Sequence, residues 1–453
     1  MRNRVSSATR LIVAASGVSS VAFGSEPVGP DITVGDITGG LNYGAVGEIH
    51  AYAFGFTACN AGDAPIDWQA DTNRHPVFAT QLYRLADGQF EQIGLAWAFH
   101  EFFPLELNLC GDCTPSGFTD SLGAGCGNAN SAGLGGAQQT LGPRTEINAR
   151  TGVFPFPPAG FNQTGDAVFK RLQASRDDLQ TPEARFFVEG LYIAPDDAQA
   201  GNQHNNASHR EVRFSPGALS PQLLGATVER QPAIFAWQAA DPGVMITEGT
   251  APDGGRYLVA SRATEFDTGE WRYEYAVYNQ NASRNAIGFD APHRGRTDFP
   301  RAFDLGFHDV DYHSGEPVDP TDWAGEEAVF SAHWEVVPPA PLSAVPNELR
   351  WGTLYNFRFS SFDPPVESSV RITVGGGAGS GESFRVPAVA AGPARCSVAD
   401  FAEPYFVLDL ADIQRYIALF TAGAPDADLR PPLGVLDLAD LQAFIAGFLG
   451  ACE

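Results

Sequence analysis

The chain has 453 residues, of which 54 are acidic and 28 are basic, so its formal net charge at pH 7 is −26. A charge of this size argues against nucleic acid and anionic membrane surfaces as partners. The 49 glycines, 33 prolines and 32 phenylalanines indicate a turn-rich fold with an aromatic core and argue against a mainly helical one.

Residues 1–24 have the pattern of a secretory signal peptide. Three arginines accompany an apolar segment (LIVAASGVSSVAF), and Ala22-Phe23-Gly24 offers small residues for cleavage. The apolar segment is too short to span a bilayer as a helix, and no second stretch of membrane length follows it. We therefore expect an exported protein, secreted or held at the cell surface, without a transmembrane segment.

The long middle part, residues 25–385, consists of short β-type runs separated by turn signals. Two hairpins are the clearest: residues 75–85 and 90–99 flank an ADGQ turn, and residues 256–266 and 271–279 flank a DTGE turn. Many strands without βαβ alternation predict a mainly β fold built as a β-sandwich. The length allows either one elaborated sandwich or two packed lobes.

Helical periodicity is scarce in this part of the chain. Residues 169–179 (FKRLQASRDDL) are the best candidate for a helix. A glycine-rich stretch begins at Gly375, and the residues after it predict a flexible linker at 386–394. The linker would separate the β-sandwich from a small helical domain at 395–453.

The six cysteines form an even set, which in an exported chain predicts disulfide bonds. If the two C-terminal cysteines pair, the other four form two bonds, and the sequence leaves all three connectivities open. A zinc site at the C-G-D-C segment (110–113) is the alternative. The cysteines are Cys59, Cys110, Cys113, Cys126, Cys396 and Cys452.

The C-terminal segment contains a tandem repeat with an offset of 28 residues. Residues 400–420 (DFAEPYFVLDLADIQRYIALF) and 428–448 (DLRPPLGVLDLADLQAFIAGF) are identical at twelve of 21 aligned positions. In each copy an aspartate that can act as N-cap, with a second aspartate three residues later, precedes a helical pattern. The predicted apolar stripes consist of Leu410, Ile413, Ile417 and Phe420 in the first copy and of Leu438, Leu441, Ile445 and Phe448 in the second.

Neither helix can bury its stripe alone, so we expect the two copies to pack as an antiparallel pair. A domain of this size needs a further constraint. A bond between Cys396 and Cys452 would supply one, contributing about 4 kcal/mol in the chain-entropy model.

Each copy has aspartates at its positions 1, 10 and 13. Hard oxygen ligands at such positions suit Ca²⁺. These candidate ligands are Asp400, Asp409, Asp412, Asp428, Asp437 and Asp440. With its duplication, the segment resembles the GC-type dockerin-like anchor found at the C-terminus of exported bacterial proteins. The resemblance implies duplicated EF-hand-like loops that bind Ca²⁺ and dock onto a cohesin partner.

The repeat departs from the usual dockerin loop. Ala402, Pro404 and Tyr405 stand where that loop has ligands and a glycine, and the second copy departs at the same positions. The loop is also one residue longer than the usual twelve. The alternative interpretation is therefore that the six aspartates only cap helices. Attachment to a partner is expected under either interpretation.

The densest polar cluster of the middle part is GFHDVDYHSGEP (306–317). In an extended conformation Asp309, Asp311 and His313 share one face and form a candidate divalent-metal set. The alternative is a loop whose side chains bond the backbone. Together with RWGTLYNFRF (350–359), this cluster resembles segments of uncharacterised exported proteins with the same anchor, a resemblance that implies no activity.

Three further groups of residues have a structural and a functional interpretation. The histidines of residues 204–209 suggest a solvated loop, and the His–Glu neighbours at 100–101 and 333–335 suggest surface pairs. Tryptophans 323, 334 and 351 are either core residues or exposed platforms that stack on sugar rings.

We expect an exported, non-catalytic binding or structural protein, anchored to a cell-surface or extracellular partner by its dockerin-like domain. G-x-S-x-G and H-E-x-x-H motifs are absent from the sequence. The alternative is an extracellular carbohydrate-active hydrolase that degrades polysaccharide. Its carboxylate pair would have no fixed spacing in the sequence.

Overall fold

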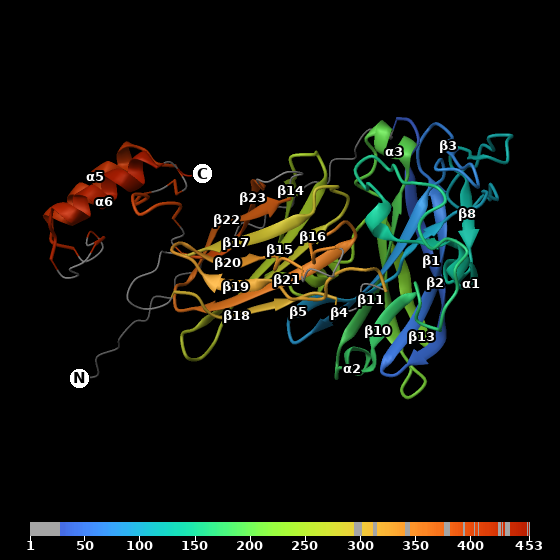
Figure 1. The fold of residues 1–453 in the computed structure, drawn as a ribbon, viewed down its shortest axis with the longest axis horizontal. Coiled ribbons are helices and arrows are strands. Elements are labelled where there is room, and N and C mark those ends of the chain that lie inside the picture. Colours follow the sequence, from blue (N-terminus) through green and yellow to red (C-terminus); the bar gives the residue numbers. More distant parts are fainter. Residues whose placement is uncertain are drawn as a thin grey trace, which may run out of the picture.

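A computed structural model of the chain is mainly β, as predicted (Figure 1). It describes residues 28–453 except for 294–300, 311–314, 340–344, 376–380, 393–394, 403, 406, 425–426, 428, 431–434, 451 and 453. The signal peptide predicted at 1–24 lies outside the described residues. The strands form four main sheets and a two-stranded one, and the two longest helices lie in the C-terminal segment.

Sheets 1 and 2 contain the strands of the first half of the chain. Sheet 1 consists of β1 (Ile32–Val46), β2 (Ile49–Asn60), β8 (Gly127–Asn130) and β10 (Leu172–Ser175). Sheet 2 has the order β13 (Pro221–Val228), β12 (Ala207–Phe214), β11 (Arg185–Ile193), β4 (Val77–Ala86), β6 (Ala98–His100) and β9 (Leu141–Gly142), and β5 (Gln89–Leu95) also pairs with β4. The two-stranded sheet joins β3 (Ile66–Asp67) and β7 (Ser121–Leu122).

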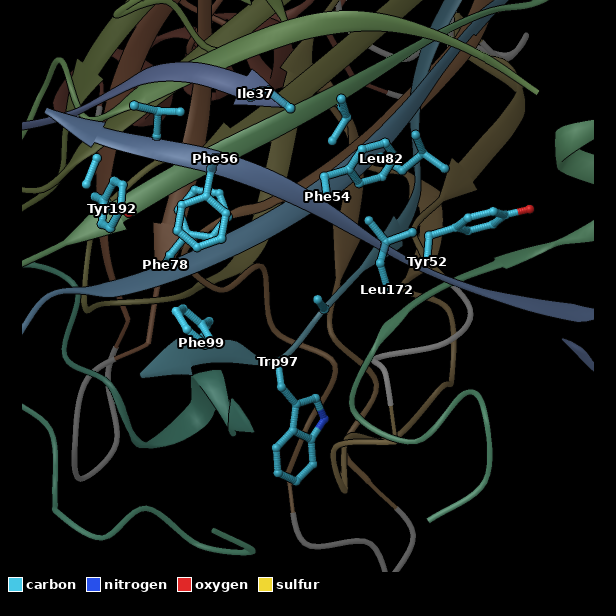
Figure 2. Packing of buried hydrophobic residues seen from close by; sticks show 14 of the residues in the cluster. Ile37, Tyr52, Phe54, Phe56, Phe78, Leu82, Trp97, Phe99, Leu172 and Tyr192 are labelled. Atoms are coloured by element: carbon cyan, nitrogen blue, oxygen red, sulfur yellow. The ribbon is translucent and has the colours of Figure 1, made fainter. Parts of the chain in front are cut away.

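Sheets 1 and 2 pack face to face, and we call them the first sheet pair. Aromatic side chains fill the space between them, because alternate residues of each strand point to the same side. Figure 2 shows Phe56 of β2 against Phe78 of β4, with their ring centroids 3.6 Å apart. Tyr192 of β11 and Phe99 of β6 pack against the same ring.

Sheets 3 and 4 contain the strands of the second half. Sheet 3 has the order β14 (Met245–Thr250), β15 (Arg256–Glu265), β16 (Trp271–Asn279), β21 (Thr353–Ser361) and β18 (Phe303–His308). Sheet 4 has the order β19 (Ala324–Glu327), β20 (Ser331–Glu335), β17 (Ala286–Pro292), β22 (Pro365–Val374) and β23 (Glu382–Ala391). These two sheets also pack face to face, around a second aromatic core, and form the second sheet pair.

The two predicted hairpins are confirmed. β4 pairs with β5, and β15 pairs with β16 in a register without shifts. The long alternating strand β16 places Tyr273, Tyr275 and Val277 in the core of the second sheet pair. Its other face carries Ala276 and Tyr278, which belong to a different apolar cluster.

That cluster lies between sheets 2 and 3, so the middle part of the chain consists of two packed lobes. Phe90 and Phe187 of sheet 2 meet Tyr278 and Leu354 of sheet 3 there. In Figure 1 the first sheet pair (blue to green) and the second (yellow to orange) accordingly lie side by side. The sequence left open whether this part forms one elaborated sandwich or two lobes. Two lobes form because the outer faces of sheets 2 and 3 are apolar and cover each other.

Hydrogen bonds also cross this boundary. The Tyr278 hydroxyl donates to the buried carboxylate of Glu189 at 2.6 Å. Arg144 donates from Nε to the carbonyl oxygen of Ala96 at 2.7 Å and from Nη1 to that of Gly352 at 3.2 Å. Burial raises the pKa of Glu189 to about 7. Polar groups that would be costly to bury alone are thus paired across the lobes.

The helices outside the C-terminal segment are short. They are α1 (Ala132–Gly135), α2 (Arg176–Leu179), α3 (Pro195–Ala200) and α4 (Phe235–Ala240), with 3-10 turns η1 (Gln138–Thr140) and η2 (Arg144–Glu146). The C-terminal segment contains α5 (Leu410–Thr421) and α6 (Leu438–Leu449), drawn in red in Figure 1. Among the described residues, no helix combines the length and apolar character needed to cross a membrane.

Two local predictions were wrong. Residues 169–179 do not form one helix, because Leu172–Ser175 pair with β2 as a strand and only Arg176–Leu179 are helical. The predicted linker at 386–394 is a strand as far as Ala391, since the second half of β23 pairs with β22. In both places hydrogen bonding to a neighbouring strand overrides the local preference.

Candidate docking module

Both C-terminal helices begin at the predicted aspartates. Asp409 is the N-cap of α5, and its Oδ1 accepts the N–H of Ala411 at 2.7 Å. Asp437 caps α6 through the N–H of Ala439 at the same distance. In each helix the third residue is also an aspartate, which completes a capping box.

This third aspartate also holds the start of its own loop. Asp412 Oδ1 accepts the N–H groups of Phe401 and Ala402 at 2.6 and 2.8 Å, and its Oδ2 accepts that of Asp409 at 2.9 Å. Asp440 has the same three bonds, at the same distances, in the second copy. The duplicated sequence therefore builds a duplicated carboxylate clamp.

The two clamp residues, Asp412 and Asp440, are also predicted calcium ligands. Both oxygens of Asp412 and of Asp440 accept backbone N–H groups. Burial would raise the pKa of Asp440, but the backbone hydrogen bonds outweigh it and hold that pKa below its ordinary value. Asp412 and Asp440 therefore act as helix caps, as the alternative interpretation of the repeat has it, and Ca²⁺ binding by the set stays a prediction.

Asp400 and Asp428 stand at the first position of the two copies. Asp400 is buried, and its Oδ2 accepts the N–H of Cys396 at 3.0 Å. Its carboxylate lies within 4.8 Å of the sulfur atoms of Cys396 and Cys452, which are joined to each other. Asp428 lies outside the described residues.

The two helices pack through equivalent residues of the two copies. Tyr416 and Phe444 are 28 positions apart in the sequence, and their rings stack with centroids 4.1 Å apart and planes 5° from parallel. Phe401 contacts both rings. Sequence reasoning missed this pair, although an aromatic residue at the same place in both copies was the signal for it.

The predicted apolar stripes were half wrong. Ile413 and Phe420 pack into the small core, as do their equivalents in the second copy. The remaining residues point to solvent, with exposed fractions of 65% for Leu410, 52% for Ile417, 66% for Leu438 and 48% for Ile445. Each helix has apolar residues on more than one face, so periodicity alone could not choose the buried one.

The exposed apolar residues repeat with the sequence. Leu410 corresponds to Leu438 and Ile417 to Ile445, and the exposed Val407 corresponds to Val435 in the same way. Large apolar side chains at equivalent exposed positions are typical of an interaction surface. We call Leu410, Ile417, Leu438 and Ile445 the outer apolar residues.

All six cysteines are paired. Cys396 bonds to Cys452 and so ties the start of the C-terminal segment to its end. The other bonds join Cys59 to Cys110 and Cys113 to Cys126. The C-G-D-C cysteines therefore belong to two disulfides and not to a zinc site.

Of the metal set in the middle part, the structure places only Asp309. This residue is buried, and its Oδ2 accepts the Asn347 amide at 2.5 Å. Asp311 and His313 lie outside the described residues. Glu316, from the same cluster, forms a buried ion pair with Arg350 at 2.9 Å and accepts the N–H of Arg144 at 2.6 Å. Asp309 and Glu316 thus have structural partners in the interior.

Other predicted surface groups are also interior. Trp323, Trp334 and Trp351 are at most 4% exposed and belong to the apolar core, as the structural interpretation had it. His100 and Glu101 are buried and not a surface pair, because β6 lies inside the first sheet pair. His209 is likewise buried on β12, whereas the preceding loop is partly solvated.

The carboxylates with the most strongly raised pKa values lie inside the fold. Burial raises the pKa of Glu101 to about 8, and hydrogen bonds from Tyr192 and Asn130 offset only part of that effect. Asp197, held by the Asn206 amide at 2.8 Å, also has its pKa raised by burial, to about 8. Glu101 is 3% exposed and Asp197 is fully buried.

Comparison of the chain with models of known protein families finds no match, and comparison with curated proteins finds no similar sequence.

Proposed function

We propose that this chain is an exported, non-catalytic binding or structural protein whose C-terminal segment, residues 395–453, attaches it to a partner protein. The partner would be a cohesin-like or other protein at the cell surface or in the extracellular space. The two sheet pairs would act as β-sandwich lobes that present the binding surface.

The outer apolar residues carry this proposal. Leu410 and Leu438 are each about two thirds exposed, although leucine is usually buried. Their helices already bury a different face, through Tyr416 and Phe444. A second apolar face that repeats in both copies is explained by a partner that covers it.

Two other observations support the export and the non-catalytic role. Three disulfide bonds are typical of a protein that matures in an oxidising compartment. The buried carboxylates are engaged with tyrosine, asparagine and backbone donors in the interior. A glycoside hydrolase needs such groups in a cleft.

Substitution of the outer apolar residues tests the attachment. Leu410, Ile417, Leu438 and Ile445 would all be changed to Gln in the full-length protein, and binding to immobilised purified cohesin domains would be measured by surface plasmon resonance. We expect the wild type to bind and the fourfold variant to lose at least about tenfold in affinity, since several anchor residues are removed.

Exposed neighbours on α5 provide the control. A Gln414→Ala, Arg415→Ala variant should bind as the wild type does, and circular dichroism should show that all variants keep their helices. Equal binding by the fourfold variant and the wild type would show that the outer apolar residues are not the docking surface. If the wild type binds no cohesin, the cohesin partner is wrong.

A further inference from the structure

Sheet 4 aligns charged side chains in one row across all five of its strands. Glu326 of β19 lies opposite His333 of β20, and His333 lies opposite Asp290 of β17. Asp290 in turn lies opposite Arg371 of β22, which lies opposite Arg385 of β23. Residues directly opposite each other in antiparallel strands share one face of the sheet. We call these five residues the charged row.

The charged row lies on the outer face of sheet 4. Its sequence neighbours Phe289, Trp334, Ile372 and Val386 all belong to the core of the second sheet pair. Because successive side chains of a strand alternate between faces, the row points away from that core.

The carboxylate of Asp290, at the centre of the row, is already hydrogen-bonded. Asp290 Oδ1 lies 2.9 Å from His333 Nδ1 and accepts the Ser331 hydroxyl at 3.1 Å. Its Oδ2 accepts Arg371 Nε at 3.0 Å. Burial would raise the pKa of Asp290, but the bonds with His333 and Arg371 hold it below its ordinary value. The carboxylate therefore fixes the positions of the His333 and Arg371 side chains.

Two arginines stand at one end of the row. Like charges directly opposite each other in a sheet are unfavourable, yet Arg371 and Arg385 form such a pair. Partial burial and the charge of Arg371 lower the pKa of Arg385. Two acidic groups, Glu326 and Glu335, neighbour His333 and lie toward the opposite end of the row.

Four of the five residues of the charged row line a surface pocket of about 370 Å³. Asp290, His333, Arg371 and Arg385 line it together with Arg395, from the start of the C-terminal segment. The rest of the lining includes the apolar residues Pro292, Val329 and Phe330. The pocket thus combines three guanidinium groups with an apolar wall, in a protein whose net charge is −26.

We propose that this pocket binds the carboxylate or sulfate group of a small acidic sugar, with the oxyanion on the arginines and the carbon skeleton on the apolar wall. Arginine guanidinium groups match planar oxyanions through paired hydrogen bonds. Asp290 of the charged row already holds Arg371 in place, through the 3.0 Å bond from Arg371 Nε to Oδ2. The proposal rests on the binding role of the β lobes and is independent of C-terminal attachment.

Isothermal titration calorimetry of the full-length protein at pH 7 and low salt tests the proposal. Glucuronate is the probe, glucose is its neutral counterpart and inorganic sulfate is the bare oxyanion. We expect one glucuronate per chain and no heat from glucose. Sulfate that binds as tightly as glucuronate would overturn the contribution of the apolar wall, and weaker sulfate binding would support it. Absence of binding by both anions, or equal binding of glucose and glucuronate, would overturn the proposal.

Substitution of Arg385 locates the site. Arg385→Gln should weaken glucuronate binding about tenfold or more, because a charge-assisted contact is lost. Arg385→Lys should weaken it less, since the charge remains. Arg272→Gln, which changes an arginine lining a different pocket, is the matched control. Unchanged binding by Arg385→Gln would place the ligand elsewhere.

A second measurement applies to the unsubstituted protein and needs no variant. Glucuronate should raise the melting temperature of the tryptophan fluorescence transition, and glucose should not, because only a ligand of the folded state stabilises it. The absence of any shift at saturating glucuronate would contradict the calorimetric result. Since none of these measurements involves the outer apolar residues, failure here leaves the docking proposal untouched.

Discussion

Two carboxylates of the β lobes and one of the C-terminal module are all buried, yet their pKa values shift in opposite directions. In the lobes, Glu101 and Glu189 each accept a tyrosine hydroxyl group, and burial raises their pKa values to about 8 and about 7. In the module, the buried Asp440 accepts backbone N–H groups, and its pKa is lowered. The surroundings of a buried acid, more than its depth, therefore decide whether it is neutral or charged.

The lobes and the module also differ in the interactions that stabilise them. The lobes have large aromatic clusters within and between the sheet pairs. The module has a core of a few residues around Tyr416 and Phe444, supplemented by two carboxylate clamps and a disulfide. Small domains cannot bury enough apolar surface, so specific polar and covalent links replace it.

All seven tryptophans lie at or before position 351, so their fluorescence reports only on the lobes. The two 12-residue helices lie in the module, so its unfolding contributes a loss of helical signal in far-ultraviolet circular dichroism. The two regions can therefore be perturbed and observed separately.

The largest expected effect is on the lobes. Phe357 is fully buried between Phe289, Trp323 and Trp334. Phe357→Ala should lower the free energy of unfolding by about 3–5 kcal/mol, because it leaves a cavity in the second sheet pair. Urea titration followed by tryptophan fluorescence measures this loss. Phe357→Leu should cost less, and an equal cost would mean that the ring is not closely packed.

The second-largest expected effect is a loss of stability in the C-terminal module alone. Asp412→Ala removes the acceptor of three N–H groups and should lower the stability of the module by about 3 kcal/mol, with no change in tryptophan fluorescence. Thermal melting followed by circular dichroism measures it. Asp440→Ala should behave in the same way, because its bonds are equivalent. Addition of Ca²⁺ to the wild type should leave the melting temperature unchanged if the aspartates only cap, and a rise would support the metal-loop hypothesis.

The smallest effect concerns the pH dependence of the lobes. The pKa of Glu101 is about 8 in the folded state against 4.5 ordinarily, so between these values the folded state keeps a proton that the unfolded state loses. Its contribution to stability is therefore complete below pH 4.5 and is lost as the pH rises toward 8. Glu101→Gln, which stays neutral, should remove up to about 2 kcal/mol of the decline between pH 5 and pH 7.

Other buried groups titrate in the same range, so the difference between the wild type and the variant is the quantity to measure. Glu189 and Asp197 act in the same direction as Glu101. Burial lowers the pKa values of His75 and His100 to about 4 and about 3, and these histidines act in the opposite direction below pH 6.5. Parallel curves for the two proteins between pH 5 and pH 7 would show that Glu101 is charged in the folded state.

Local patterns in the sequence were enough for the elements that depend on near neighbours. The hairpin of β15 and β16 follows from alternation on both sides of a DTGE turn, and the starts of α5 and α6 follow from aspartates at N-cap positions. The duplication was legible for the same reason, because it needs only a comparison of two segments.

The sequence by itself therefore determined the mainly β character of the long middle part, its clearest hairpins and the two capped C-terminal helices. Only the tertiary structure decided which face of each helix is buried, that the strands divide into two sheet pairs, and that Asp290, Arg371 and Arg385 stand in one row. The physical reason is that periodicity specifies how a segment repeats along its own axis. Which side of that segment meets which partner depends on residues far away in the chain.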